Sequence, residues 1–157
     1  MLDTTFKTQF TDAVLVVLEE SFDHATGLYL DQGASLFETL ATISAEEASR
    51  PVSATCASLA AQVEHVSFLL NFTLDSVEGR KPDEDWDRIW RTVHEVTPEE
   101  WEASKQRLRE THQRVVALVK GYETWEFDGA ISGAIIMLVH TAYHIGEIRQ
   151  ALCTLKG

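Results

Sequence analysis

Cysteine and proline are scarce in this chain, with 2 and 3 residues among 157. The two cysteines, Cys56 and Cys153, lie far apart, and neither has another cysteine at the spacing of a zinc-ligand pair or a redox motif. This pattern argues against a disulfide framework and against a thiolate metal site. We expect two reduced thiols, as in a cytoplasmic protein.

Long hydrophobic runs are missing as well. The longest run covers residues 134–139, whereas a membrane-spanning helix needs roughly 20 apolar residues. The first residues, 1–5, do not form a basic segment followed by an apolar core, so no signal peptide is visible. We therefore expect a cytoplasmic protein without a membrane partner.

Basic residues are few relative to acidic ones. The chain has 13 Lys and Arg against 25 Asp and Glu, which gives a formal net charge of −12. The basic side chains are interleaved with acids and form no cluster, so the surface repels phosphate backbones. The sequence therefore argues against nucleic acid as a partner.

Apolar residues, by contrast, are present in the proportion of a folded protein. They make up 45% of the chain, and aromatic residues make up 9%. This composition argues against disorder, and 157 residues are enough to bury a core. We expect a single domain over residues 1–157.

Four long stretches have apolar residues at spacings of three and four, which is typical of amphipathic helices. These stretches cover about residues 5–22, 55–79, 98–121 and 129–155. The third has the clearest start, because Thr97 is a good cap, Pro98 fits the first turn and Glu100 stands at the third position. Gly79 suits the end of the second stretch.

A long link joins the first two of these helices. Residues 24–34 contain two glycines and predict a loop. Two Ser-x-x-Glu sequences then predict short helical turns with capping boxes. These pairs are Ser35 with Glu38 and Ser44 with Glu47. Pro51 ends this segment.

No stretch predicts a strand, so the fold class is all-α, and four long helices favour a bundle. The long link argues against a plain series of antiparallel hairpins. A further short turn is expected around Trp86, Ile89 and Trp90, covering one end of the core. The sequence pattern does not determine how the helices pack.

Histidines lie on the apolar stripes of two predicted helices. The stripe of the second helix comprises Leu59, Gln62, His65, Phe68 or Leu69, and Phe72. The stripe of the last helix comprises Ile136, His140, His144 and Ile148.

His140 and His144 are four residues apart, so a helix places them on one face, one turn apart. Two imidazoles at this spacing can bind one divalent ion. His65 would complete a three-nitrogen site with one coordination position open. The alternative is that each histidine is a hydrogen-bonded core residue. Spacing alone leaves both interpretations open.

The chain resembles the DinB/YfiT-like family in residues 140–149, whose sequence is HTAYHIGEIR, and upstream in residues 40–51 and 60–65. Members of this family are four-helix bundles, mostly bacterial. They hold a divalent metal with one histidine of the second long helix and two of the last. The resemblance covers nearly the whole chain and implies that His65, His140 and His144 bind a metal in a bundle of this type.

The resemblance also implies a function. Characterised relatives include transferases and isomerases that use a low-molecular-weight bacterial thiol. We therefore expect a cytoplasmic, homodimeric, metal-dependent enzyme that activates such a thiol for reaction with a small-molecule substrate. A metal-dependent hydrolase is the second expectation. The competing interpretation is a stress-related bundle in which the metal is structural and no reaction occurs.

Three neutral imidazoles leave the charge of a divalent ion uncompensated, which would acidify a bound water or thiol. Such a site accepts zinc or nickel, and also iron or copper, so the residues do not identify the native metal.

Glu147 departs from the family pattern, in which glutamine is common at this position. It lies three residues after His144 and on nearly the same face. As a candidate catalytic residue, it could accept a hydrogen bond from a ligand imidazole, act as a fourth ligand, or serve as a base. Equally, it could be solvated or paired with Arg149.

The remaining polar residues near these motifs are expected to be incidental. We expect Glu64 to be a surface charge and Tyr143 to be a packing residue rather than an acid. His24, His94 and His112 lie in loops or on mixed faces, and only His24 is a candidate for proximity to the site.

Overall fold

The fold is all-α, as expected. The computed structural model describes residues 4–157, and these form seven helices. The helices are α1 (Thr4–Phe22), α2 (Leu36–Leu40), α3 (Ala45–Ser49), α4 (Leu59–Val77), α5 (Arg88–Thr92), α6 (Pro98–Gly121) and α7 (Ala130–Lys156). The expectation about a signal peptide depends in part on Met1–Asp3, which lie outside the described residues.

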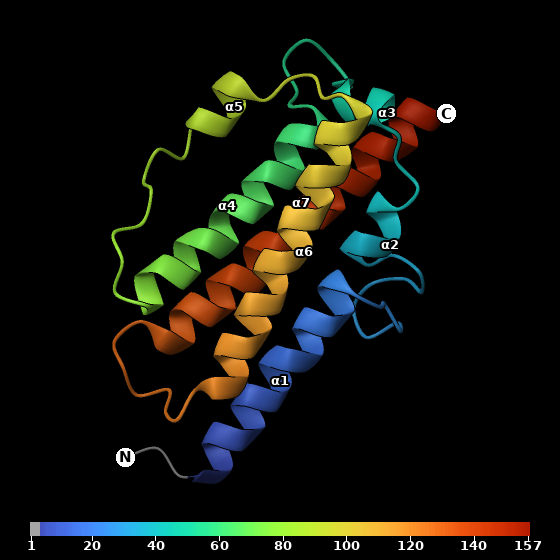
Figure 1. Ribbon diagram of the computed structural model, residues 1–157. Helices are drawn as coiled ribbons and strands as arrows, with labels where there is room; N and C mark the ends of the chain where they lie inside the picture. Colours follow the sequence, from blue (N-terminus) through green and yellow to red (C-terminus); the bar gives the residue numbers. More distant parts are fainter. Residues whose placement is uncertain (1–3) are drawn as a thin grey trace.

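The four long helices pack together. Helix α4 packs against α6 and α7, and α1 packs against the same two helices from the other side. As Figure 1 shows, α1 and α7 run in one direction, and α4 and α6 run in the opposite one. Because α4 and α6 are parallel, residues 78–97 must return along the length of α4 before α6 can begin. This return segment carries α5.

The core lies between the four long helices and extends under α2 and α3. Its largest fully buried side chains are Trp101, Phe22, Leu18, Leu36, Leu40, Leu59, Leu70, Leu74, Leu108, Met137, Ile145 and Ile148. Trp101 also ties α6 to the segment between α2 and α3, because its indole N–H donates to the carbonyl of Ile43 at 2.8 Å. A buried indole needs such a partner.

The helix starts follow the capping signals of the sequence. The capping boxes at Ser35, Ser44 and Thr97 are all present, each with its glutamate at the third position. The predicted start of the second long helix near Thr55 is wrong, because α4 begins at Leu59. The hydroxyl of Ser58 accepts a hydrogen bond from the N–H of Ala61, so the serine is the cap that sets this start.

The predicted stripe of α7 is only partly buried. Ile148 and His144 are buried, but Ile136 is 60% exposed, and Met137 takes the inward position one residue later. Because a helix has 3.6 residues per turn, a residue four positions further along lies about 40° beyond one full turn. Four residues at this spacing therefore rotate away from the core along the helix, which is why the first of them lies outside it.

The tryptophans of the return segment lie along the side of α4 rather than over one end of the core. The structure places α5 at Arg88–Thr92, and Trp86 precedes it. Trp86 packs on Phe68 and Phe72, with ring centroids 4.9 and 4.8 Å apart. These contacts hold the return segment against α4.

Helix α7 is long and apolar enough, by length and composition, to cross a membrane. The longest unbroken apolar run, residues 134–139, is too short to indicate this, because the apolar residues of α7 continue beyond it between polar ones. Core helices of folded bundles meet the same criterion. In the structure, α7 packs against α1 and α4 and buries Met137, Thr141 and Ile145 between them.

A buried carboxylate organises the loop after α1. Glu20 is 2% exposed and accepts hydrogen bonds from the backbone N–H groups of residues 26–30 and from the hydroxyl of Thr26. Burial alone would raise the pKa of Glu20, but the hydrogen bonds from Thr26, Leu30 and Tyr29 lower it from 4.5 to about 2. The carboxylate therefore replaces water as the partner of this loop.

We expect Glu20→Gln to lower the melting temperature by several degrees at neutral pH, because the amide has one acceptor oxygen instead of two and no charge. Since the folded-state pKa lies below the unfolded one, the stabilisation by Glu20 is complete above about pH 4.5 and is lost as the pH falls towards about 2. The melting-temperature difference between the variant and the parent should shrink over this range. Glu19→Gln, at an exposed neighbouring position, is the control. A difference independent of pH would contradict this account.

Candidate metal centre

Three histidines from two helices meet in the space between α4 and α7. His65 lies in the middle of α4 and is 6% exposed, and His144 on α7 is 4% exposed. His140, one turn earlier on α7, is partly exposed. The packing of α4 against α7 therefore brings the three predicted ligands together.

The three imidazoles point the same type of nitrogen at one another. The Nε2 atom of His140 lies 3.3 Å from Nε2 of His65 and 3.3 Å from Nε2 of His144. Ligands on a tetrahedral ion at roughly 2.0–2.1 Å are themselves about 3.3–3.4 Å apart. The three residues are thus a group that could hold one metal ion. Among the described residues, no fourth histidine, cysteine or carboxylate joins the group.

His144 is held in place through its other ring nitrogen. Its Nδ1 lies 2.6 Å from the side-chain oxygen of Gln62 and 2.9 Å from Oε2 of Glu147. Because both oxygens are acceptors, the proton belongs on Nδ1, and the lone pair on Nε2 faces the other two histidines. Glu147 thus contacts the far side of the imidazole, and Gln62 shares this role.

The Nδ1 atoms of the other two imidazoles are buried without such partners in the described residues. Nδ1 of His65 and Nδ1 of His140 have no hydrogen-bond partner in the described part of the chain. Burial and the neighbouring imidazoles of His144 and His140 lower the pKa of His65 to about 4. Burial likewise lowers the pKa of His140 and of His144. All three are therefore neutral at pH 7, which is the form that binds a metal.

Aromatic side chains of the return segment cover His65. The ring of Trp90 lies over the imidazole, with centroids 4.4 Å apart and planes tilted by 32°. Trp86 approaches the same imidazole edge-on at 6.3 Å. Two tryptophans therefore keep water from one side of the cluster and limit the orientation of His65.

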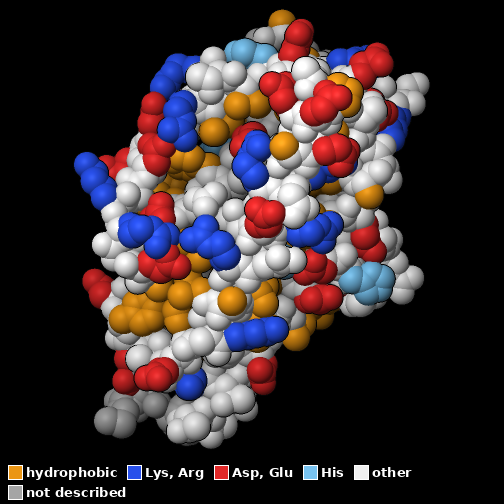
Figure 2. All heavy atoms as spheres, in the orientation of Figure 1, with side chains coloured by type: hydrophobic (Ala, Val, Ile, Leu, Met, Phe, Trp, Pro, Cys, Tyr) orange, Lys and Arg blue, Asp and Glu red, His pale blue; other side chains and the backbone are white. Residues whose placement is uncertain are grey.

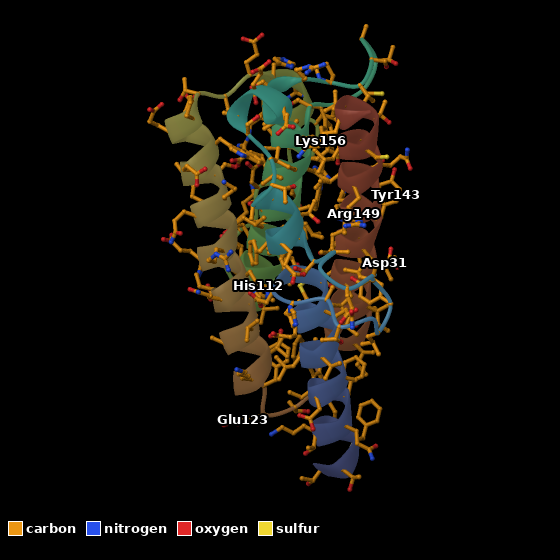
Figure 3. All side chains as sticks on the ribbon, turned by 90° about the vertical axis from the view of Figure 1, so that its right-hand side faces the viewer. Asp31, His112, Glu123, Tyr143, Arg149 and Lys156 are labelled. Carbon is orange, nitrogen blue, oxygen red and sulfur yellow. The ribbon has the colours of Figure 1, made fainter. Side chains whose placement is uncertain are left out.

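The cluster and Trp90 line a cavity of about 850 Å³. The walls come from the segments before α4 and after α5 and from α7, and they include Cys56, His94, Tyr143 and Glu147. Tyr143 is exposed on the outer side of α7 (Figure 3), so it does not pack in the core as expected. A hydrogen bond to Glu147 raises the pKa of the Tyr143 phenol. The cluster is thus accessible to a small molecule.

Two of the remaining histidines lie apart from the cluster. His24 bonds to Glu38 at 2.9 Å, so the one candidate for proximity is not part of the site. His112 is buried and stacks on Phe22 at 4.3 Å, and burial lowers its pKa to about 4. It is His94 that lines the cavity.

Three features of this region were not expected from the sequence. Glu64 is not a simple surface charge, because it accepts hydrogen bonds from Ser104 at 2.5 Å and Arg107 at 2.6 Å and so joins α4 to α6. The sequence pattern predicted that Gln62 lies on the buried stripe but indicated no contact between Gln62 and the site. Its position, three residues before His65 on the same face, is the one signal that could have revealed its contact with the site. Nothing in the sequence indicated that Trp90 covers His65, because residues 78–97 have no helical periodicity that could orient it.

Replacing His65, His140 or His144 with alanine should lower the affinity for Zn²⁺ by more than about 100-fold. Each replacement removes one of three ligands, and the loss of a residue that only orients a ligand already costs up to about 100-fold. The melting temperature of the metal-free protein should change only moderately, since the aliphatic core remains. Elemental analysis of untagged protein and chelator competition measure the affinity. His94→Ala is the control that leaves the cluster intact. Full metal content in any of the three variants would exclude the site.

No family model, no curated protein and no solved structure matches this chain. The structure shows an all-helical protein with a buried three-histidine cluster that could hold a metal ion.

Proposed function

We propose that this protein is a metal-dependent enzyme related to the DinB/YfiT-like bundles, in which His65, His140 and His144 bind one divalent ion. Two independent lines support this proposal. One is the likeness of residues 140–149 to the signature of that family. The other is the 3.3 Å spacing of the three Nε2 atoms, which suits a tetrahedral ion.

The observation that most favours a reaction over a structural role is the position of the cluster at a cavity wall. Structural zinc sites are closed by four protein ligands, whereas catalytic sites have three and leave one position open. Here three nitrogens converge, no fourth ligand joins them within residues 4–157, and about 850 Å³ of space adjoins them.

When bound, a divalent ion with three neutral ligands lowers the pKa of a water or thiol that it coordinates. Imidazole accepts zinc, nickel, iron and copper, and of these we favour zinc or nickel, with iron or copper as the alternatives. The chain itself supplies the orientation of the ligands. Gln62 and Glu147 fix the imidazole of His144, and Trp90 excludes water from one face of His65.

Transfer of a low-molecular-weight thiol to a small electrophile is the reaction that we favour. The cavity is in the upper part of the size range of ligand pockets, so it has room for a thiol and a second substrate together. Hydrolysis needs a single substrate and is the second candidate. Cys56 and Cys153 are both unpaired. This agrees with the reducing cytoplasm, where such thiols are found and where we place the protein.

The metal-loaded protein should accelerate conjugation of a small bacterial thiol to a chlorinated nitroarene or an epoxide. Glu147→Gln should lower kcat by about 10-fold while metal content stays nearly intact, because the amide keeps an acceptor oxygen for His144 but loses the negative charge beside it. Steady-state kinetics and elemental analysis measure the two effects. The matched control is Glu123→Gln, an exposed carboxylate far from Tyr143 and the cavity (Figure 3).

Absence of turnover with several thiols and simple esters would contradict the enzymatic proposal. If metal removal also unfolded the protein, the ion would be a structural link between α4 and α7. If the protein hydrolysed esters but conjugated no thiol, the second candidate would replace the first.

We also propose that the chain forms a homodimer through α7. Ile136, Val139 and Tyr143 form an exposed stripe on this helix, and Val139 is 63% exposed. Residues 130–146 include no Asp, Glu, Lys or Arg. In a protein of net charge −12, this stripe is a surface where two copies can meet without repulsion.

Val139→Glu should convert the dimer to a monomer, because two carboxylates would face each other across the two-fold axis. Light scattering after gel filtration measures the mass. Val16→Glu, at an exposed position on α1, should leave the dimer intact. A parent protein that is monomeric at micromolar concentration would refute the dimer without bearing on the metal.

A further inference from the structure

A second cavity lies in the lower half of the bundle, between the C-terminal part of α4, the C-terminal part of α6 and the start of α7. Its volume is about 480 Å³. Most of its wall is aromatic or aliphatic, with Leu69, Phe72, Trp86, Tyr122, Trp125 and Met137 among the lining residues. Figure 2 shows hydrophobic side chains gathered in the lower half of this face, between bands of charged residues.

Small residues of α7 create the space. Ala130, Gly133 and Ala134 face the cavity from three positions of the first turns of this helix. A Cβ atom added at Gly133 would meet nothing within 4 Å, so the room there is not filled by a neighbour.

The charge of the wall restricts what can bind. Asp128 is the single acidic residue among the lining residues, and no lysine or arginine is among them. An anionic ligand would have no counter-ion there and would approach a protein of net charge −12. An apolar wall without a cation instead suits an uncharged ligand.

We propose that this cavity is a binding site for a compact, uncharged, apolar molecule of about two or three rings or an equivalent aliphatic chain. The size follows from the volume, because an apolar cavity of about 150 Å³ already binds benzene. The aromatic wall provides stacking and edge-to-face contacts. Phe127 is a lining residue that remains exposed, so it marks the mouth through which the ligand enters.

This site is distinct from the histidine cavity. No residue lines both cavities. Trp86 stands between them, since it lines the apolar cavity and its ring lies 6.3 Å from that of His65. Binding of the apolar ligand therefore does not require the metal, and the inference goes beyond the function proposed above.

The test uses N-phenyl-1-naphthylamine, an uncharged three-ring fluorophore that emits strongly only in apolar surroundings. The full-length protein, treated with chelator, should bind the fluorophore saturably, with one site per chain. The bound fluorophore should quench the tryptophan emission of the protein, because Trp86 and Trp125 line the cavity. Metal-loaded protein should bind it equally well. Lack of saturable binding would overturn the proposal, and it would leave the metal-binding measurements unaffected.

The Gly133→Leu variant tests whether the fluorophore binds in this cavity. The new side chain has room at its Cβ and fills the cavity, so the affinity for the fluorophore should fall at least about tenfold while the melting temperature is kept or raised, since leucine favours a helix more than glycine does. The matched control is Gly121→Leu, an exposed helical glycine outside the cavity whose added Cβ also meets nothing.

Unchanged affinity in Gly133→Leu would place the fluorophore elsewhere and refute the cavity as its site. Val139→Glu distinguishes the nearest competing surface, the exposed stripe of α7. If binding is lost in Val139→Glu and kept in Gly133→Leu, the fluorophore occupies that stripe. If binding is kept in Val139→Glu and lost in Gly133→Leu, the cavity is the site.

Discussion

The packing of α4 against α7 is the contact on which the rest of this structure depends. It brings His65 to His140 and His144, and it places Gln62 of α4 against the Nδ1 atom of His144 on α7. The two helices run in opposite directions, so a shift of one turn between them would move His65 by about 5.4 Å and separate the nitrogens. Apolar residues on both sides of the histidines, such as Leu70 and Ile145, fix this register.

Burial acts on the histidines in two ways. It keeps the imidazoles neutral, which is the form that coordinates a metal, and it leaves Nδ1 of His65 and Nδ1 of His140 without a partner among residues 4–157. Buried polar atoms of this kind usually have one, so the cluster is under-satisfied as a purely structural core. A metal ion between the Nε2 atoms would use the lone pairs that face one another, although it would not provide a partner for these two Nδ1 atoms. The other buried residues of α4 and α7 are mostly apolar, which explains how the helices tolerate it.

The sequence predicted the elements better than their arrangement. Capping boxes at Ser35, Ser44 and Thr97 located helix starts correctly because they are local interactions. The i, i+4 spacing of His140 and His144 also acts within one helix. By contrast, Ile136 was placed inward because a four-residue stripe ignores its rotation around the helix. Trp90 lies over His65 because of the way in which the return segment crosses α4, and no local pattern in residues 78–97 predicts that crossing.

The histidines and their hydrogen-bond partners lie on long helices, whereas much of the cavity wall comes from irregular segments before α4 and after α5. Helical positions are rigid, while connecting segments tolerate substitutions and insertions. The two tasks of the site therefore fall on parts of the chain that can change independently. Substitutions in residues 50–57 and 93–95 could therefore change which molecule enters, while the affinity for the ion would be inherited unchanged.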